Sequence, residues 1–213
     1  MCYFWGMNES KTPQSLLIES EQNHDRQLVN DIIEESEDTS PWYALRLFGC
    51  RQPAVEEYFK DNGMECFVPR RMVDYEDRSG RLRHEVRPVV TNLLFVKKTV
   101  TTAQMTELVQ NSRFQLLVIR KEKGSRDYSE IPAKQMLEFR MMCDPDKAEG
   151  IFLTAEEAQL KPGDPVEVHF GPLKGLTGRL VRQHKKYYLL KEVTGLGVMV
   201  RVTRWCCRPV SPK

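Results

Sequence analysis

Hydrophobic and polar residues follow two different patterns along the chain, one before and one after residue 150. Before it, short apolar segments rich in aromatic and β-branched residues predict strands at residues 42–48, 64–68, 88–96 and 114–119. Apolar residues spaced three or four apart predict helices at residues 53–62, 101–110 and 131–142. Strands and helices interleaved in this way favour one sheet covered by helices.

A separate hairpin is predicted between the second and third of these strands. Residues 70–77 and 81–87 form two long arms on either side of Ser79-Gly80, a dipeptide typical of turns. The expected order of the front half is therefore β-α-β-β-β-α-β-α.

The pattern after residue 150 is all-β. Short strands are predicted at residues 165–169, 177–182, 187–191 and 198–202, separated by glycine-containing and lysine-containing turns. About fifty residues give a small core, so we expect a barrel with closed edges. The chain as a whole is predicted to be α+β, with a leader at 1–40, a first domain at 41–143, a linker at 144–161 and a second domain at 162–213.

Charge divides the chain differently. Residues 1–41 hold nine Asp and Glu against two Lys and Arg, whereas the remaining residues carry 30 basic and 21 acidic groups. The leader has too little apolar surface to offset the entropy lost on ordering, so we expect it to be flexible or only partly helical. The rest of the chain is basic. Its charge imbalance is pronounced in residues 163–213, which contain ten Lys and Arg and three Asp and Glu.

Composition argues against several classes of protein. No apolar run reaches the roughly 18 residues of a membrane span, and no secretion signal is recognised, so we expect a cytoplasmic protein. The six cysteines have no metal-ligand spacing, and we expect free thiols. The four histidines lie in unrelated contexts, and neither a phosphate-binding loop nor a nucleophile motif is present. We therefore predict no enzyme, no catalytic residue, no metal and no cofactor.

A glycine-rich motif opens the second domain. Its residues are Gly163, Asp164, Val166, Val168, Gly171, Pro172, Gly175 and Gly178, and the phrase GDxVxV followed by GPxxGxxG resembles the KOW motif. The glycines are expected to permit the tight, positive-φ corner between the first two strands of a small SH3-like barrel, and the alternating valines to fill its interior.

The first domain carries a second resemblance. Residues 42–46, 63–69 and 92–96 resemble the NGN domain of NusG-type factors in order, spacing and residue type. Together the two matches cover residues 42–213. The amino-acid sequence of residues 65–69 and 92–96 is most similar to the UpxY branch of specialised antiterminators, found beside capsular polysaccharide operons in Bacteroides-type bacteria. The resemblance implies a ferredoxin-like NGN domain, a flexible linker and a KOW barrel.

The same resemblance implies a transcription elongation or antitermination factor that binds RNA polymerase at the clamp helices of its largest subunit. Carried to matching positions, the polymerase-binding residues would be Tyr43, Arg46, Phe67, Val90, Thr91, Asn92, Leu93 and Phe95. Because side chains alternate along a strand, about half of such a set must be core. General NusG proteins have an aromatic residue at the position of Leu93, a departure that favours a specialised paralogue.

Nucleic-acid and further protein contacts are also predicted. Arg78, Arg81 and Arg83 at the hairpin tip would lie near upstream or non-template DNA, although the hairpin's acidic residues also allow a solvated, self-paired hairpin. Leu196 and Gly197 lie where NusG presents a partner-binding loop to Rho or a ribosomal protein, and Leu196 replaces the usual Phe. The stretch at 185–188 mixes cations with aromatics, a pattern that fits a contact with nascent RNA or a ribosomal partner and fits a surface turn equally well.

Two other interpretations stay open at this point. The chain could be a general NusG acting on most genes, or a KOW-bearing ribosomal or RNA-binding protein. The departure at Leu93 and the long acidic leader favour the specialised role, on a surface polysaccharide operon. We expect a monomer.

Overall fold

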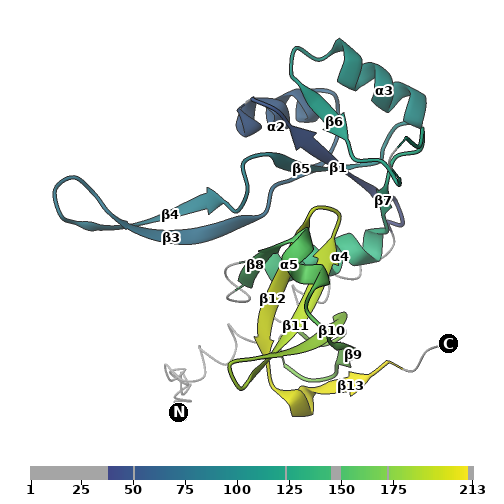
Figure 1. The fold of residues 1–213 in the computed structure, drawn as a ribbon. Coiled ribbons are helices and arrows are strands. Elements are labelled where there is room, and N and C mark those ends of the chain that lie inside the picture. The colour runs from purple at the N-terminus through teal and green to yellow at the C-terminus, as the bar shows by residue number, and fades with distance from the viewer. Residues whose placement is uncertain (1–37, 50, 123, 145–149, 172, 211–213) are drawn as a thin grey trace, which may run out of the picture. The chain divides into compact units, whose positions relative to one another are not determined.

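The structure is a computed structural model that describes residues 38–49, 51–122, 124–144, 150–171 and 173–210. The predicted leader up to residue 37, the predicted linker residues 145–149, and Pro172 of the glycine-rich motif lie outside the described residues. The described part is mixed α+β, as predicted, with two larger antiparallel sheets and one separate hairpin (Figure 1).

The first sheet has the strand order β2-β5-β1-β6, and β7 also pairs with β1. Its strands are β1 (Trp42–Leu47), β2 (Cys66–Phe67), β5 (Leu93–Lys97), β6 (Leu116–Val118) and β7 (Glu130–Ile131). The helices between them are α2 (Gln52–Asp61), α3 (Thr102–Asn111) and α4 (Ala133–Cys143). The order differs from the expected β-α-β-β-β-α-β-α at two places, because four strands, β2 to β5, lie between α2 and α3, and the short strand β7 precedes α4. Only the second half of the apolar run at 88–96 belongs to β5.

Local signals explain where the helices begin. Pro53 lies in the first turn of α2, where its missing N–H is not needed. Thr101 caps α3, because its side chain accepts a hydrogen bond from the backbone N–H of Gln104 while the Gln104 side chain accepts from the backbone N–H of Thr101.

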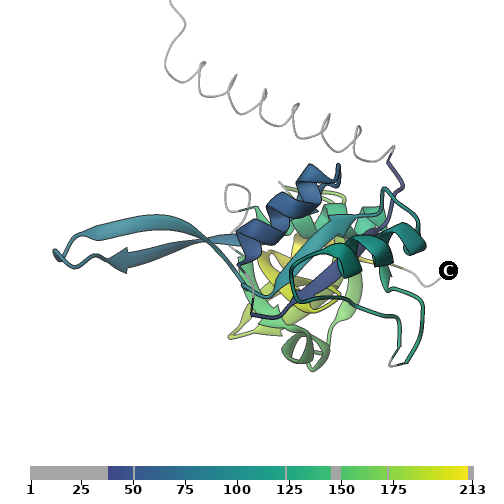
Figure 2. The ribbon, with the colours of Figure 1, turned by 90° about the horizontal axis from the view of Figure 1, so that it is seen from above.

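One face of the first sheet, the inner face, lies beneath α2 and α3. Tyr43, Leu45 and Leu47 of β1 point into this core with residues of β5, α2, α3 and β6. Figure 2 shows α2 and α3 over this part of the sheet. The opposite, outer face therefore carries Trp42, Ala44 and Arg46, because successive side chains of a strand point to opposite sides.

Helix α4 covers one end of the outer face. The ring of its Phe139 packs 5.8 Å from the ring of Phe95, measured between centroids. The guanidinium of Arg140 lies 5.4 Å from the ring centre of Trp42 and 5.6 Å from that of Phe67. The outer face is thus closed at the end where Phe95 and Trp42 lie.

The hairpin is a two-stranded sheet of its own, made of β3 (Arg70–Glu76) and β4 (Leu82–Pro88). It extends away from the first sheet (Figures 1 and 2). Nearly all of its side chains are exposed, on both faces. The predicted hairpin is confirmed.

The second sheet has six strands in the order β13-β9-β10-β11-β12-β8. They are β8 (Gly150–Thr154), β9 (Asp164–Val168), β10 (Thr177–Gln183), β11 (Lys186–Val193), β12 (Leu196–Val202) and β13 (Cys207–Pro209). The helix α5 (Ala155–Gln159) follows β8, and a short 3-10 helix, η1 (Arg204–Cys206), follows β12.

The predicted closed barrel is wrong for this sheet, because its hydrogen-bonded path has two ends, β13 and β8. The free edge of β12 that a closing strand would need is occupied by β8. That strand and α5 come from residues 150–159, which the sequence assigned to a linker. Helix α5 covers Leu190 and Met199 on one face of the sheet through its buried Ala158.

The other face of the second sheet contacts α4. Glu138 of α4 is buried and forms an ion pair with Lys191 of β11. The hydroxyl of Thr177 in β10 donates to the same carboxylate, at 2.9 Å from Oε2. Since Phe139 of the same helix packs on the first sheet, α4 ties the two sheets together.

The glycines of the predicted KOW motif act in two ways. Gly171 and Gly175 have φ of 90° and 87°, which confirms the positive-φ corner between β9 and β10. Gly163 and Gly178 instead permit close packing, because a Cβ there would lie 2.7 Å from the carbonyl oxygens of Leu180 and Leu190 respectively. Val166 and Val168 are buried as expected.

Candidate functional site

The open end of the outer face carries one row of side chains across three strands. Arg46 of β1 lies opposite Leu93 of β5 on one side and Leu117 of β6 on the other. Directly paired residues share a face, so these three side chains are neighbours. Arg46 is exposed and Leu117 is 45% exposed, whereas Leu93 is only 4% exposed.

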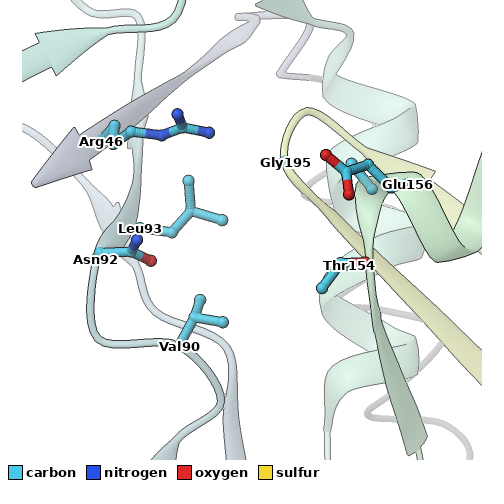
Figure 3. Close-up of a pocket in the computed structure, with 8 residues that line it drawn as sticks. Arg46, Val90, Asn92, Leu93, Thr154, Glu156 and Gly195 are labelled. Carbon is cyan, nitrogen blue, oxygen red and sulfur yellow. The ribbon is translucent and has the colours of Figure 1, made fainter.

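Leu93 is covered from the second sheet. A Cβ built on Gly195, in the turn between β11 and β12, would lie 3.5 Å from a methyl carbon of Leu93. Around this contact is a pocket of about 390 Å³. Figure 3 shows Arg46, Val90, Asn92 and Leu93 on one wall, and Thr154, Glu156 and Gly195 on the other.

The loop that carries Val90 and Asn92 is held by Gln52, a residue that the sequence analysis did not identify. Its buried side-chain amide donates to the carbonyl oxygens of Leu93, at 2.5 Å, and Val90, at 3.2 Å. The backbone N–H of Leu47 donates to the carbonyl of Asn92 at 2.9 Å. The loop is thereby fixed against β1 and α2.

Four of the predicted polymerase-binding residues lie together at this place, namely Arg46, Val90, Asn92 and Leu93. Thr91 is exposed in the same loop. Leu117 belongs beside them, but was missed because its segment reads only as a generic apolar strand. Its register against Arg46 is what brings it to the site.

The other three predicted residues do not present an exposed surface. Tyr43 is wrong as a contact, because it is fully buried on the inner face, where its ring lies 5.6 Å from that of Tyr128. Phe95 is fully buried under Phe139 of α4. Phe67 is partly buried beside Phe95 and Arg140. Strand alternation and α4 account for these corrections.

The hairpin tip is organised by Asp77 rather than by the three predicted arginines. The Asp77 carboxylate accepts hydrogen bonds from the Ser79 hydroxyl, at 2.5 Å, and from the backbone N–H of Arg81, at 3.1 Å. The guanidinium of Arg83 donates to it at 3.0 Å. These donors lower the pKa of Asp77 to about 2. Arg83 is thus self-paired, while Arg78 is exposed.

The predicted partner loop at Leu196 and Gly197 is wrong as an exposed surface. Both residues are buried in β12, and a Cβ on Gly197 would lie 2.8 Å from the Cβ of Ala158 in α5. Only Gly195 of this turn is exposed. The cover supplied by α5 could not be foreseen from a segment assigned to a linker.

Within the described ranges, no group of three or more His, Cys, Asp or Glu side chains could hold a metal ion. Cys66, Cys143, Cys206 and Cys207 are free thiols, and burial raises the pKa of Cys66 to about 12. Among the helices of the described part, none is long and apolar enough to cross a membrane.

The fold and this surface define a two-sheet α+β protein whose candidate site offers shape and charge rather than reactive groups. The family model described as transcription termination factor nusG matches residues 40–140. This segment, a little under half of the chain, is similar to that family. A comparison with curated proteins finds no match.

Proposed function

We propose that this protein is a cytoplasmic elongation and antitermination factor that binds RNA polymerase through the open end of the outer face. The contact would be made by Arg46, Val90, Leu93 and Leu117, against the clamp helices of the largest polymerase subunit. The observation that carries the proposal is the row formed by Leu93, Arg46 and Leu117 inside the segment that matches the NusG family.

The chemistry of this row suits a protein partner. Leu117 is a large apolar side chain exposed beside a cation, and Val90 adds apolar surface at the edge. A few such anchors carry most of the energy of a protein interface, and interfaces of about 1,200–2,000 Å² in total are usual. Binding that favours one polymerase conformation shifts its population away from the paused state, so no reactive group is required.

Leu93 enters the contact only after the turn at Gly195 withdraws, because that turn covers it. Arg46 and Leu117 are accessible without any rearrangement. An encounter can therefore begin at Arg46 and Leu117 and extend to Leu93 as the second sheet moves away.

Single substitutions at the exposed positions test the surface without disturbing a core. We expect Leu117→Asp and Arg46→Glu each to abolish binding to RNA polymerase from a Bacteroides-type bacterium in a pull-down. The matched control is Leu160→Asp at the end of α5, because Leu160 is also apolar and is 82% exposed. Retained binding by both outer-face variants, with unchanged thermal unfolding, would refute the surface.

The specialised role is tested in cells. If the protein serves one surface polysaccharide operon, deleting its gene lowers promoter-distal transcripts of that operon and leaves other operons unchanged. A loss of promoter-distal transcripts across the genome would instead identify a general elongation factor. Transcript profiling of the deletion strain separates these outcomes.

A further inference from the structure

A basic and aromatic surface lies at one edge of the second sheet, away from the residues used above. It is formed where β10 ends, β11 begins and β12 runs into η1. Its cations are Arg182, Lys185, Lys186, Arg201 and Arg204, and its aromatic residues are Tyr187 and Trp205 with the adjacent Phe170. We call this set the basic-aromatic surface.

The aromatic rings of this surface are unusually accessible. Trp205 is 71% exposed, and its ring lies 5.7 Å from that of Phe170, at an angle of 37°. Phe170 is itself half exposed and comes from a different loop, 35 positions earlier in the chain. Two large rings that could pack inside instead meet in solvent, which indicates a surface that a ligand covers.

The cations of this surface lie beside Tyr187 and line the same depression as Trp205. Arg182 and Arg204 each place a guanidinium 5.8 Å from the ring centre of Tyr187. A depression of about 630 Å³ beside them is lined by lysines, arginines, Tyr187 and Trp205, and no carboxylate contributes to it. Within the part of the chain that the structure describes, none of the five cations has an ion-pair partner. Their mutual repulsion would be relieved by a bound polyanion.

The turn that presents the lysines has an unfavourable backbone. His184 and Lys185 form the two-residue hairpin turn between β10 and β11, and their φ angles are 48° and 63°. Positions with positive φ in such a turn are normally occupied by glycine or asparagine. Positive φ at residues other than glycine costs conformational free energy, and such strained residues are often found at functional sites. Here the conformation places exposed Lys185 and Lys186 at the rim of the depression.

We propose that the basic-aromatic surface binds single-stranded RNA. Bases stack on Trp205 and Phe170, and phosphates contact the lysines and arginines, a combination typical of sequence-tolerant single-strand binding. An acidic protein would use the charges but would not need the exposed rings. A duplex keeps its bases stacked inside, so it also leaves the rings unused. The choice of RNA over DNA rests on the proposed function, since a factor carried by polymerase lies near the emerging transcript.

The test uses the full chain and a fluorescent oligouridylate of about ten nucleotides, near the site size of one small β-domain. Polymerase is absent, so the outcome does not depend on the outer-face proposal. Anisotropy gives the affinity. The chain also contains Trp5 and Trp42, so stacking on Trp205 is reported by the part of the fluorescence quenching that disappears in Trp205→Phe. The outer-face variant Leu117→Asp should bind this RNA as the unaltered protein does.

Two substitutions of Trp205 separate the ring from the fold. Trp205→Ala removes the stacking platform and should weaken RNA binding about tenfold. Trp205→Phe keeps a platform, so it should retain most of the affinity while losing the part of the fluorescence quenching that comes from Trp205. Thermal unfolding should be unchanged in both, because the side chain is mostly exposed.

A double charge reversal tests the cations against a matched control. The double variant Lys185→Glu with Lys186→Glu should weaken RNA binding. The slope of log affinity against log salt concentration should also become shallower by about 0.7 for each phosphate that the variant no longer neutralises. Lys121→Glu with Lys134→Glu changes net charge equally, at exposed positions outside the second sheet, and should have little effect.

Several results would overturn the proposal. These are unchanged binding in Trp205→Ala, an equal weakening in the control pair, tighter binding of the same sequence as single-stranded or duplex DNA, and equal competition by polyglutamate at matched charge. The last result would identify a site for acidic proteins instead.

Discussion

The ion pair between Glu138 and Lys191 gives the sharpest energetic prediction. Both side chains are largely buried where α4 meets the second sheet, and the Thr177 hydroxyl supplies the only further donor from another side chain among the described residues. Lys191→Met preserves much of the side-chain volume but leaves the Glu138 carboxylate in a buried place without its cation. Removing one partner of such a pair costs about 3–5 kcal/mol. Since domains are stable by about 5–15 kcal/mol, this is a large fraction of the total.

Urea unfolding followed by circular dichroism and tryptophan fluorescence measures this loss. The double variant Glu138→Gln with Lys191→Met should recover most of the stability, because a neutral amide oxygen still accepts from Thr177 and no buried charge remains. The control is Lys60→Met, whose ammonium group pairs with Glu56 at the surface, so its loss should change the unfolding free energy far less than Lys191→Met does. A loss below about 1 kcal/mol for Lys191→Met would show that α4 is held by packing alone.

Three other expectations follow from individual contacts. Gln52→Leu leaves the Val90 and Leu93 carbonyls without their donor, so we expect a loss of about 2 kcal/mol in unfolding free energy and faster amide exchange at 89–92; unchanged exchange would mean that the loop is held otherwise. Gly178→Ala forces a Cβ to within 2.7 Å of the Leu190 carbonyl oxygen and should lower stability by about 1–3 kcal/mol in thermal unfolding, whereas a neutral effect would imply a strand that moves freely. The Asp77 pKa, depressed to about 2, predicts that the carboxylate stabilises the hairpin turn above about pH 4, and that this contribution is lost as the pH falls through 2. Amide shifts of Ser79 followed by NMR should titrate there, and a midpoint near pH 4 would contradict the turn geometry.

Local sequence signals predicted most of the elements. The aromatic run at Trp42 and the proline at position 53 are sufficient to start β1 and α2, because their preferences depend on neighbours in the chain. The same locality limits what could be foreseen. Residues 150–154 become a strand only by pairing with β12, about forty-five positions later, so composition alone indicated a linker.

The candidate site was harder to predict than the fold, because it depends on register and on contacts between distant segments. A shift of one position along β1 separates the exposed Arg46 from the buried Leu45, and motif similarity alone placed Tyr43 on the wrong face. Leu117 became visible only through its pairing with Arg46. Gln52 and Trp205 lie outside every motif, and their partners are far away in the sequence.

The turn at Gly195 competes with any ligand that binds Leu93. It is tethered within the same chain, so it competes for that side chain at a constant effective concentration that dilution cannot reduce. A partner that needs Leu93 therefore binds with an apparent affinity scaled by the fraction of molecules in which the turn has left. A second ligand that prefers molecules in which the turn has left would raise the affinity of the first ligand. By thermodynamic reciprocity, the first ligand raises the affinity of the second by the same factor, so binding at one sheet would change binding at the other.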